Sequence, residues 1–565
     1  MSESQKKQNF LHGATILVAA TIIVKVIGAV YKIPLQAILG KIGYSYFSSA
    51  YDIYTLLLLI STAGLPVAMS RMISQASSLN DHAQTRRVYN TSRTIFLMIG
   101  TVSAVLMMIF CKTLANSQKQ PDAALSIFCL APCAFLMSVI STYRGFFQGQ
   151  SNMIPTSISQ VLEAVFKLAA GLVGALVILH LNGSIPMAAA GAILGVTVSC
   201  AVSVAYLFRV FHKPAQQMIL EQKQPNFCGA TAKQLLSIAI PITIGAAGLQ
   251  LLIVSETSIY MNRLVDLLDR GALTGPLVEA LRSEVLAEAQ KAGQVLTTAE
   301  LHSRIAASMK GIYNFSQTIY NLPNSLITPI TISIIPAITN CLTLGDDRGV
   351  KATSESASRV TALLSLPCSV GLMVLSRPIM GLLGGYTGVQ LDFAAKLLSL
   401  LGISVFMRAL VLFTNSLMQA NGHANIPVIN MLSIGVLRMI LVFVFTGNPR
   451  IGLLAVPALT ALGNLATAVL NLICMAKIVP QKCAIVRNLL KPLLPALLMG
   501  AATFASWQFM LRILGPDCSY IFQVGGPMVV AAAVYVVSAA WLRSITREDC
   551  LLLPKGEKIA KLLRL

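Results

Sequence analysis

Long apolar stretches, separated by short polar segments, run along almost the whole chain. A helix rises about 1.5 Å per residue, so about 20 apolar residues cross the hydrocarbon core of a bilayer. Windows of this length predict fourteen membrane-spanning helices and hence an all-α polytopic membrane protein. The expected spans are residues 12–39, 46–72, 91–113, 122–144, 155–180, 185–211, 233–259, 308–340, 360–384, 391–418, 427–447, 452–478, 491–513 and 521–543.

Basic residues gather in segments that follow even-numbered spans. The basic segments follow spans 2, 6, 8, 12 and 14 and include Arg86, Arg87, Arg93, Arg209, Lys213, Lys223, Arg348, Lys351, Lys482, Arg487, Lys491, Arg543 and Arg547. Cytoplasmic loops carry such an excess of Lys and Arg. We therefore expect both termini to lie in the cytoplasm.

One loop on the opposite side is long and polar. Residues 264–305 are rich in Glu, Arg and Ala. Gly275-Pro276 is typical of a helix start, and Thr297 with Glu300 forms a capping-box pattern. The segment therefore predicts a small external helical hairpin, which is either a solvated insertion or a lid over an external opening.

Three pairs of short motifs recur about 270 residues apart. The pairs are 148–155 with 419–427, Leu65-Pro66 with Ile335-Pro336, and Ser92-Arg93 with Ser358-Arg359. This spacing predicts two six-helix lobes with the same orientation, related by a parallel pseudo-twofold repeat. The expected organisation is an N-terminal lobe (1–211), a cytoplasmic linker (212–232), a C-terminal lobe (233–478), two extra helices (479–543) and a cytoplasmic tail (544–565).

Composition agrees with a membrane protein. The chain is 55% hydrophobic and only 11% charged, against about 25% charged in soluble domains. Its net charge of +21 is spread between apolar spans, which favours the positive-inside bias over nucleic-acid binding. The 11 Cys predict no disulfide framework, the 6 His form no cluster that predicts a metal site, and the lack of a Walker A pattern argues against an ATP-driven pump.

Two lysines interrupt the first apolar span. Lys25 and Lys32 are seven residues apart, so they share one face of a helix. An ammonium in hydrocarbon costs about 3 kcal/mol on insertion scales, so it normally faces a polar cavity, a partner or the interface. We expect Lys25 and Lys32 to line a passage for an anionic substrate, with snorkelling to the interface as the alternative.

Further ionisable residues lie within later spans. Asp52 is either a counter-ion or an interfacial residue, since Tyr44, Tyr46, Tyr51 and Tyr54 around it resemble an aromatic belt. Glu163 and Lys167 have i,i+4 spacing and form either a self-neutralised structural pair or a pair that switches during transport. Arg408 and Arg438 have no acid nearby in sequence, which makes them candidates for substrate binding.

Two stretches of the chain carry a family resemblance. Residues 148–167, with Gln148-Gly149, Met153-Ile154-Pro155-Thr156, Ser159-Gln160, Glu163 and Lys167, resemble a signature of bacterial polysaccharide-biosynthesis flippases. Residues 25–35 and 64–71 resemble the first two spans of the same proteins. The chain is similar to the stage V sporulation protein B-like branch of the multidrug/oligosaccharidyl-lipid/polysaccharide exporter superfamily, which is related to MurJ-type lipid II flippases.

The resemblance implies a two-lobed transporter in the bacterial plasma membrane and no enzymatic activity. It implies a cationic central cavity, onto which Lys25 maps, and outward movement of undecaprenyl-diphosphate-linked oligosaccharides, lipid II foremost, by alternating access. The expected partners are this lipid-linked glycan and membrane lipids. No cofactor is expected, although a coupling cation or the membrane potential could drive the step.

Two other functions fit parts of the sequence. A cation-coupled multidrug exporter of the same superfamily would favour acidic residues in the cavity, because drugs are usually cationic. A membrane glycosyltransferase or polymerase would favour paired carboxylates on a large external loop. Acidic residues do occur in the 264–305 segment, where they resemble the polar faces of helices: Asp266, Asp269, Glu279, Glu284 and Glu288.

Overall fold

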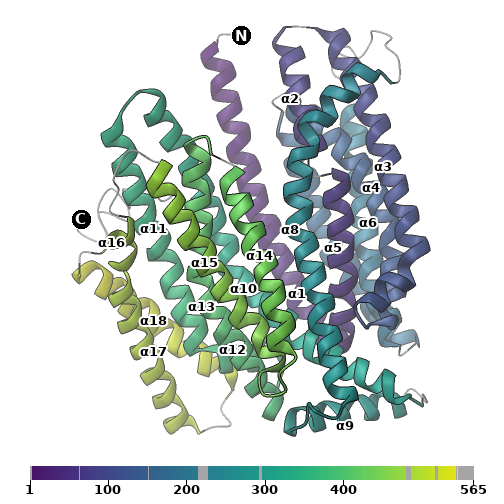
Figure 1. The fold of residues 1–565 in the computed structure, drawn as a ribbon, viewed down its shortest axis with the longest axis vertical. Helices are drawn as coiled ribbons and strands as arrows, with labels where there is room; N and C mark the ends of the chain where they lie inside the picture. Colours follow the sequence, from purple (N-terminus) through teal and green to yellow (C-terminus); the bar gives the residue numbers. More distant parts are fainter. Residues whose placement is uncertain are drawn as a thin grey trace. The chain divides into compact units, whose positions relative to one another are not determined.

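Helices are the only regular structure in the part of the chain that the structure describes. The computed structural model describes residues 3–62, 64–79, 81–150, 152–182, 184–213, 227–291, 295–423, 425–478, 485–515, 519–542 and 544 (Figure 1). Twelve segments within these ranges are long and apolar enough to cross a membrane. The predicted all-α polytopic class is therefore confirmed, whereas the count of fourteen spans stays a prediction.

The first two expected spans belong to one long, kinked element. Helix α1 (Glu3–Thr62) contains Gly40 at φ 66° and ψ −175°, in the left-handed half of backbone space that favours glycine. Two helical segments therefore meet at Gly40. The second segment ends at Thr62 rather than at the expected residue 72, and α2 (Leu65–Ser78) then begins with a proline in its first turn.

The structure forms two compact units, residues 1–269 with 282–311, and residues 270–281 with 312–565. We call these unit 1 and unit 2. Unit 1 includes α8, which was expected in the C-terminal lobe, and the boundary after Gly311 falls within α10. Most of the expected linker and tail, residues 214–226 and 545–565, lie outside the described residues. The parallel repeat and the two transport lobes stay predictions.

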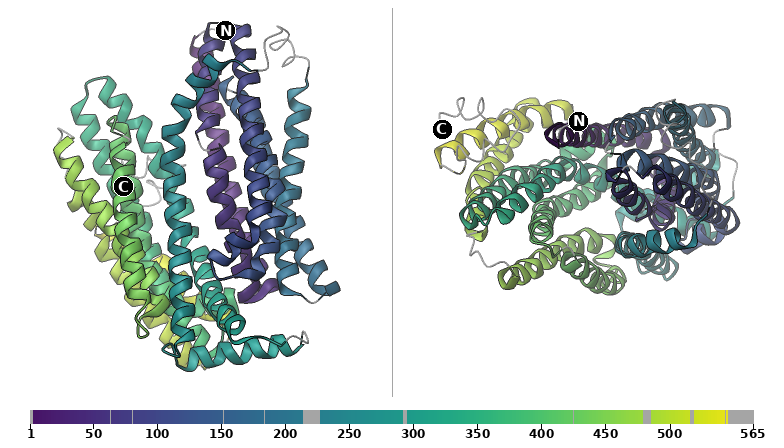
Figure 2. Two further views of the ribbon diagram at one scale, coloured as in Figure 1. Left: turned by 45° about the vertical axis from the view of Figure 1, so that its right-hand side comes forward. Right: turned by 90° about the horizontal axis from the view of Figure 1, so that it is seen from above.

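Unit 1 is a bundle of long helices. It contains α3 (His82–Ser117), η1 (Pro121–Ala123), α4 (Ala124–Gly149), α5 (Ile154–Asn182), α6 (Ile185–Phe211) and α8 (Gly229–Asp269) in addition to α1 and α2. Helix α1 packs against α4, α5, α6 and α8 (Figures 1 and 2). Glycines bring α5 and α6 into backbone contact, because a β-carbon on Gly195 would lie 2.2 Å from the Gly171 nitrogen.

The polar insertion is helical, as expected, and is divided between the units. Helix α9 (Pro276–Lys291) begins at the expected proline, and α10 (Thr298–Thr343) begins at the expected capping box. There the Glu300 carboxylate accepts hydrogen bonds from the Thr297 N–H (2.8 Å) and hydroxyl (2.9 Å), and these bonds lower the pKa of Glu300. The expected span 233–259 is only the central part of α8.

Bonds from residues 282–311 hold this part of the insertion against other elements of unit 1. Lys41 forms an ion pair of 2.7 Å with Glu284, and Arg304 lies 3.4 Å from Asp122. His302 contacts Asp269 at 2.6 Å. Val285 and Ala289 of α9 are buried. Residues 282–311 are therefore docked by several specific contacts.

Unit 2 contains α11 (Asp347–Val374), α12 (Ser376–Gly384), α13 (Gly388–Ala420), α14 (Asn425–Thr446), η2 (Gly452–Leu454), α15 (Ala455–Ile478), α16 (Ile485–Leu490), α17 (Leu493–Leu514) and α18 (Tyr520–Trp541). The expected span 360–384 is divided, because α11 ends at Val374 and α12 begins two residues later. A buried core that includes Ile338, Val350 and Phe413 joins α10, α11 and α13. The last two helices pack against each other and against α11 and α12.

Candidate anion-binding site

Four of the seven candidate residues lie in one charged cluster of unit 1. They are Lys32, Asp52, Glu163 and Lys167. The first two come from α1, on opposite sides of the Gly40 kink, and the other two from α5. The kink and the packing of α1 on α5 therefore bring together residues that the sequence separates by more than a hundred positions.

Lys167 is held by aromatic side chains of α1. Its ammonium donates a hydrogen bond of 3.0 Å to the Tyr51 hydroxyl and lies 4.4 Å from the centre of the Tyr51 ring. It also lies 5.8 Å from the centre of the Tyr31 ring, and Tyr31 in turn contacts Phe47. Cation–π contacts of this kind stabilise a desolvated ammonium. Aromatic side chains from both segments of α1 therefore hold Lys167.

The expected aromatic belt is wrong for three of its four tyrosines. Tyr44, Tyr46 and Tyr54 are buried, and the Tyr46 hydroxyl donates a hydrogen bond of 3.0 Å to Asp122. These rings pack inside unit 1, where α1 contacts α4, α5, α6 and α8. Asp52 lies in the same segment of α1 as these buried rings, and its role as a counter-ion stays a prediction.

Glu163 pairs with a residue that sequence reasoning missed. Its carboxylate lies 3.0 Å from Arg144 Nη2 of α4, and Arg144 Nε donates a hydrogen bond of 2.9 Å to Ser159. The expectation of a self-contained Glu163–Lys167 pair is therefore incomplete, although the Glu163 charge still acts on Lys167. The only sequence signal was an arginine at the end of an apolar span.

Lys310 is the second missed residue, and it is fully buried. Its ammonium donates hydrogen bonds to the Ser49 hydroxyl and, at 3.0 Å, to Gln118 Oε1. Ser49 and Asp52 are three residues apart in α1, so they share a helix face. A lysine just inside the expected span 308–340 was the available signal.

A chain of buried polar groups supports Lys310. The Ser49 hydroxyl donates to Gln120 Oε1 at 2.5 Å, and Gln120 Nε2 donates to Ser45 at 2.7 Å. The two glutamines belong to the connection between α3 and η1. Since buried polar groups are costly unless they are hydrogen-bonded, this chain fixes the position of Lys310.

The two lysines of the first span have different surroundings. Lys32 lies within electrostatic range of Lys167 and Asp52, and among the described residues neither Lys32 nor Lys25 has a hydrogen bond or an ion pair. Lys25 is partly exposed and lies two turns before Lys32 in α1. The roles of both lysines in substrate binding stay predictions.

Arg408 and Arg438 belong to unit 2. Arg408 lies in α13 and Arg438 in α14, and the aliphatic part of Arg438 lies against Gly463 of α15. Hydrogen bonds between neutral side chains connect the same three helices. Asn471 of α15 donates to Thr414 of α13 at 3.0 Å and accepts from Asn430 of α14 at 2.9 Å. The proposed roles of the two arginines stay predictions.

The described cluster of unit 1 carries an excess of positive charge. Four cations, Lys32, Arg144, Lys167 and Lys310, stand against two carboxylates, Asp52 and Glu163. Two positive charges remain, without counting Lys25. Such a partly desolvated surplus favours binding of an anion, because electrostatic attraction is stronger in a low-dielectric site.

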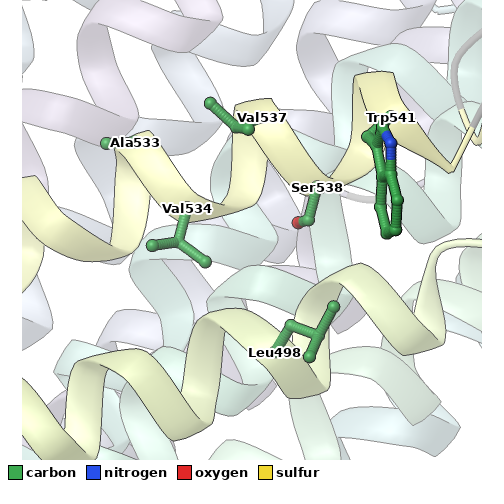
Figure 3. Close-up of a pocket in the computed structure, with 6 residues that line it drawn as sticks. All are labelled: Leu498, Ala533, Val534, Val537, Ser538 and Trp541. Carbon is green, nitrogen blue, oxygen red and sulfur yellow. The ribbon is translucent and has the colours of Figure 1, made fainter.

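An apolar groove of about 440 Å³ lies on the last two helices of unit 2. Leu498 of α17 faces Ser538 and Trp541 of α18 across it (Figure 3). Ala533, Val534 and Val537 complete the lining. With one hydroxyl among its lining side chains, the groove suits a hydrocarbon chain rather than a polar ligand.

Known proteins resemble this chain over nearly its whole length. Stage V sporulation protein B of Bacillus subtilis is 24% identical over 97% of this chain and 98% of its own. Lipid II flippase MurJ of the same organism is 24% identical over 94% of this chain and 93% of its own. The solved structure of lipid II flippase MurJ in an inward closed conformation has a TM-score of 0.64 and 13% identity, and covers 94% of this chain and 99% of that one.

Other solved transporters share the fold, including an inward-facing multidrug resistance MATE family transporter of the MOP superfamily (TM-score 0.62, 14% identity, 80% of this chain and 97% of that one). The family model for lipid II flippase MurJ matches residues 285–517. The family model for polysaccharide biosynthesis proteins matches residues 10–341, more than half of the chain. The resemblance read from the residues is confirmed, and the chain is a multi-pass membrane transporter that belongs to the polysaccharide biosynthesis protein family.

Proposed function

We propose that this transporter is a flippase that moves polyprenyl-diphosphate-linked oligosaccharides, lipid II foremost, from the inner to the outer leaflet by alternating access. The observation that carries the proposal is the surplus of partly buried positive charge in unit 1. A diphosphate leaves water at a large electrostatic cost, and fixed ammonium groups replace part of its hydration. Lys25 and Lys32 would bind the diphosphate, and Lys167 would complete the cationic wall.

The groove on α17 and α18 supports a lipid cargo. An isoprenoid tail has no hydrogen-bonding groups, so an apolar groove accommodates it without leaving polar atoms unpaired. Four of the six lining residues of α17 and α18 are Leu, Val or Ala. A fifth is Trp541, whose side chain is 80% exposed. In this proposal the tail follows the groove while the headgroup crosses.

The same charge pattern disfavours the alternatives. A cationic drug would be repelled by the positive surplus, so a multidrug exporter is the second choice. We infer that the chain performs no covalent chemistry, needs no cofactor, and lies in the bacterial plasma membrane with both termini in the cytoplasm. Movement of charge through a membrane potential yields about 2.3 kcal/mol per elementary charge per 100 mV, enough to bias the step.

Reconstitution in vesicles tests the proposal. Lipid II and a non-peptidoglycan lipid-linked glycan are placed in separate vesicles, and side-specific access to each headgroup is measured. We expect protein-dependent transfer of at least one of them, with no change in its mass. A change in mass would indicate an enzyme, and transfer of cationic drugs alone would favour the exporter.

Substitution of single lysines assigns the site. Lys25→Ala and Lys32→Ala should reduce transfer at least tenfold while expression is retained, because each removes a positive charge from the headgroup path. Lys112→Ala, which changes an exposed lysine of α3, is the matched control and should transfer at the normal rate. Full activity of Lys25→Ala would remove Lys25 from the site.

A further inference from the structure

We infer that Arg144 is a positioning residue for Lys167: it holds the Glu163 carboxylate away from Lys167 and so leaves the Lys167 charge available to an anionic headgroup. This inference rests on the proposed function and deepens it through a residue that the proposal does not use. All three side chains belong to unit 1, with Arg144 on α4 and the other two on α5.

The first step of the argument is that Arg144 is fixed at two points of α5. Its Nε donates a hydrogen bond of 2.9 Å to the Ser159 hydroxyl, and its Nη2 lies 3.0 Å from Glu163 Oε2. The Ser159 hydroxyl itself donates to the Thr156 carbonyl oxygen at 2.8 Å, so its lone pairs are left to accept from Arg144. A guanidinium presents its N–H groups in a rigid fork, and this fork bridges Ser159 and Glu163, one helical turn apart.

The second step is that Arg144 is better placed to hold Glu163 than to bind a ligand. Its side chain is 12% exposed, and two of its donor atoms are already bonded within the protein. Removal of one partner from a mostly buried charge pair leaves the other partner uncompensated. Without Arg144, the Glu163 carboxylate would therefore need another cation.

The third step is that Lys167 is the cation within reach of Glu163 on the same helix. The two are one turn apart, the i,i+4 spacing at which acidic and basic side chains meet. With Arg144 present they form no ion pair, and Lys167 forms none with any described residue. Its ammonium instead lies 3.0 Å from the Tyr51 hydroxyl and 5.8 Å from the centre of the Tyr31 ring. These uncharged side chains position the ammonium without cancelling its charge.

The consequence is a division of charges along one face of α5. Glu163 is paired with Arg144, whereas Lys167 keeps its charge on aromatic supports. In a partly desolvated site, an ammonium without an acidic partner attracts an anion more strongly than one that is already paired. A diphosphate supplies the negative charge and the acceptor oxygens that the two tyrosines lack.

The experiment compares single and combined substitutions in the full-length protein: Arg144→Met, Glu163→Gln and Lys167→Met. The probe is a water-soluble, short-chain polyprenyl-diphosphate-linked disaccharide, and its dissociation constant is measured in detergent. Arg377→Met, which breaks an ion pair between Arg377 and Asp392 in unit 2, is the matched control.

We expect Arg144→Met to weaken probe binding about tenfold, because the released Glu163 carboxylate then neutralises Lys167. Arg144→Met/Glu163→Gln should return to within about threefold of the wild type, because no Glu163 carboxylate remains to pair with Lys167. Glu163→Gln alone should bind at least as tightly as the wild type, and Arg377→Met should bind normally.

The decisive comparison places Lys167→Met in two backgrounds. It should weaken binding about tenfold in the wild type but less than about twofold in Arg144→Met, where Lys167 is already neutralised. A purely structural role of Arg144 does not produce this difference, because Lys167 would then contribute equally in both backgrounds.

Three results would overturn the inference: unchanged binding in Arg144→Met, a loss that Glu163→Gln does not relieve, or equal losses for Lys167→Met in the two backgrounds. The second result would assign Arg144 to direct contact with the headgroup. If Arg144→Met does not accumulate, Arg144→Met/Glu163→Gln decides alone. Binding within about threefold of the wild type then supports the inference, and a loss of about tenfold overturns it.

Failure of the proposed function is distinguishable from failure of this inference. If the wild-type protein binds no lipid-linked glycan, the proposed cargo is wrong, and thermal unfolding without probe still tests the pairing. The coupling between Glu163→Gln and Lys167→Met should be larger in Arg144→Met than in the wild type, because the two side chains pair only when Arg144 is absent. If the wild type binds the probe and the two couplings are equal, the cargo stands and the role of Arg144 is refuted.

Discussion

Gly311 of α10 lies directly on the backbone of Lys41 in α1: a β-carbon at Gly311 would be 2.0 Å from the Lys41 carbonyl oxygen. Lys41 follows the kink at Gly40, and Gly311 follows Lys310. The kinked backbone of one helix and the missing side chain of another therefore permit the contact that carries Lys310 to Ser49.

Gly311→Ala should destabilise the protein by about 1–3 kcal/mol or more, because the clash is with backbone atoms that cannot rotate away. The measurement is thermal unfolding in detergent. Gly371→Ala, in α11 and with open space around its α-carbon, is the control and should be neutral or slightly stabilising. Equal melting temperatures for the two variants would contradict the close contact.

The partner of Glu163 can be identified by double-mutant cycles. We expect a coupling energy of about 1–2 kcal/mol between Arg144→Met and Glu163→Gln, because the two side chains are mostly buried and bonded at 3.0 Å. The Glu163→Gln and Lys167→Met pair should give about 0.2–0.5 kcal/mol, as for an ordinary i,i+4 pair. The reverse order would restore the local pair expected from the sequence.

The docking of the insertion depends on the Lys41–Glu284 ion pair, whose nitrogen–oxygen distance is 2.7 Å. Lys41→Glu should increase protease cleavage within residues 276–305, because two carboxylates then face each other. The exchanged variant Lys41→Glu/Glu284→Lys restores opposite charges and should regain resistance. If the exchange does not restore resistance, the effect of Lys41→Glu does not arise from this pair.

A bulky side chain on α18 would fill the groove on α17 and α18. Val534→Trp should slow transfer of a long-chain lipid-linked glycan severalfold and leave binding of a short-chain analogue unchanged, because only the tail would use the groove. Val529→Trp, on the same helix but outside the lining, is the control. Equal effects on both chain lengths would argue against a tail site.

The helices, their ends and the capping box show how much of the fold local sequence can predict. The apolar windows identified the helices because each must satisfy its own backbone in a bilayer. Helix ends were less accurate: polar caps such as Asp81 and Asp346 begin α3 and α11 well before the apolar windows start. The capping box at Thr297 was correct because it is an interaction between residues three positions apart.

The sequence by itself determined the helical membrane class, the family and the presence of costly charges in apolar spans, because these follow from composition, short-range spacing and motifs. Only the tertiary structure decided which charges meet. Arg144 of α4 forms an ion pair with Glu163 of α5, and Lys310 donates a hydrogen bond to Ser49, which is 261 positions away in the sequence. Electrostatic pairing acts through space over a few ångströms, and the packing of α1 with its neighbours sets those distances.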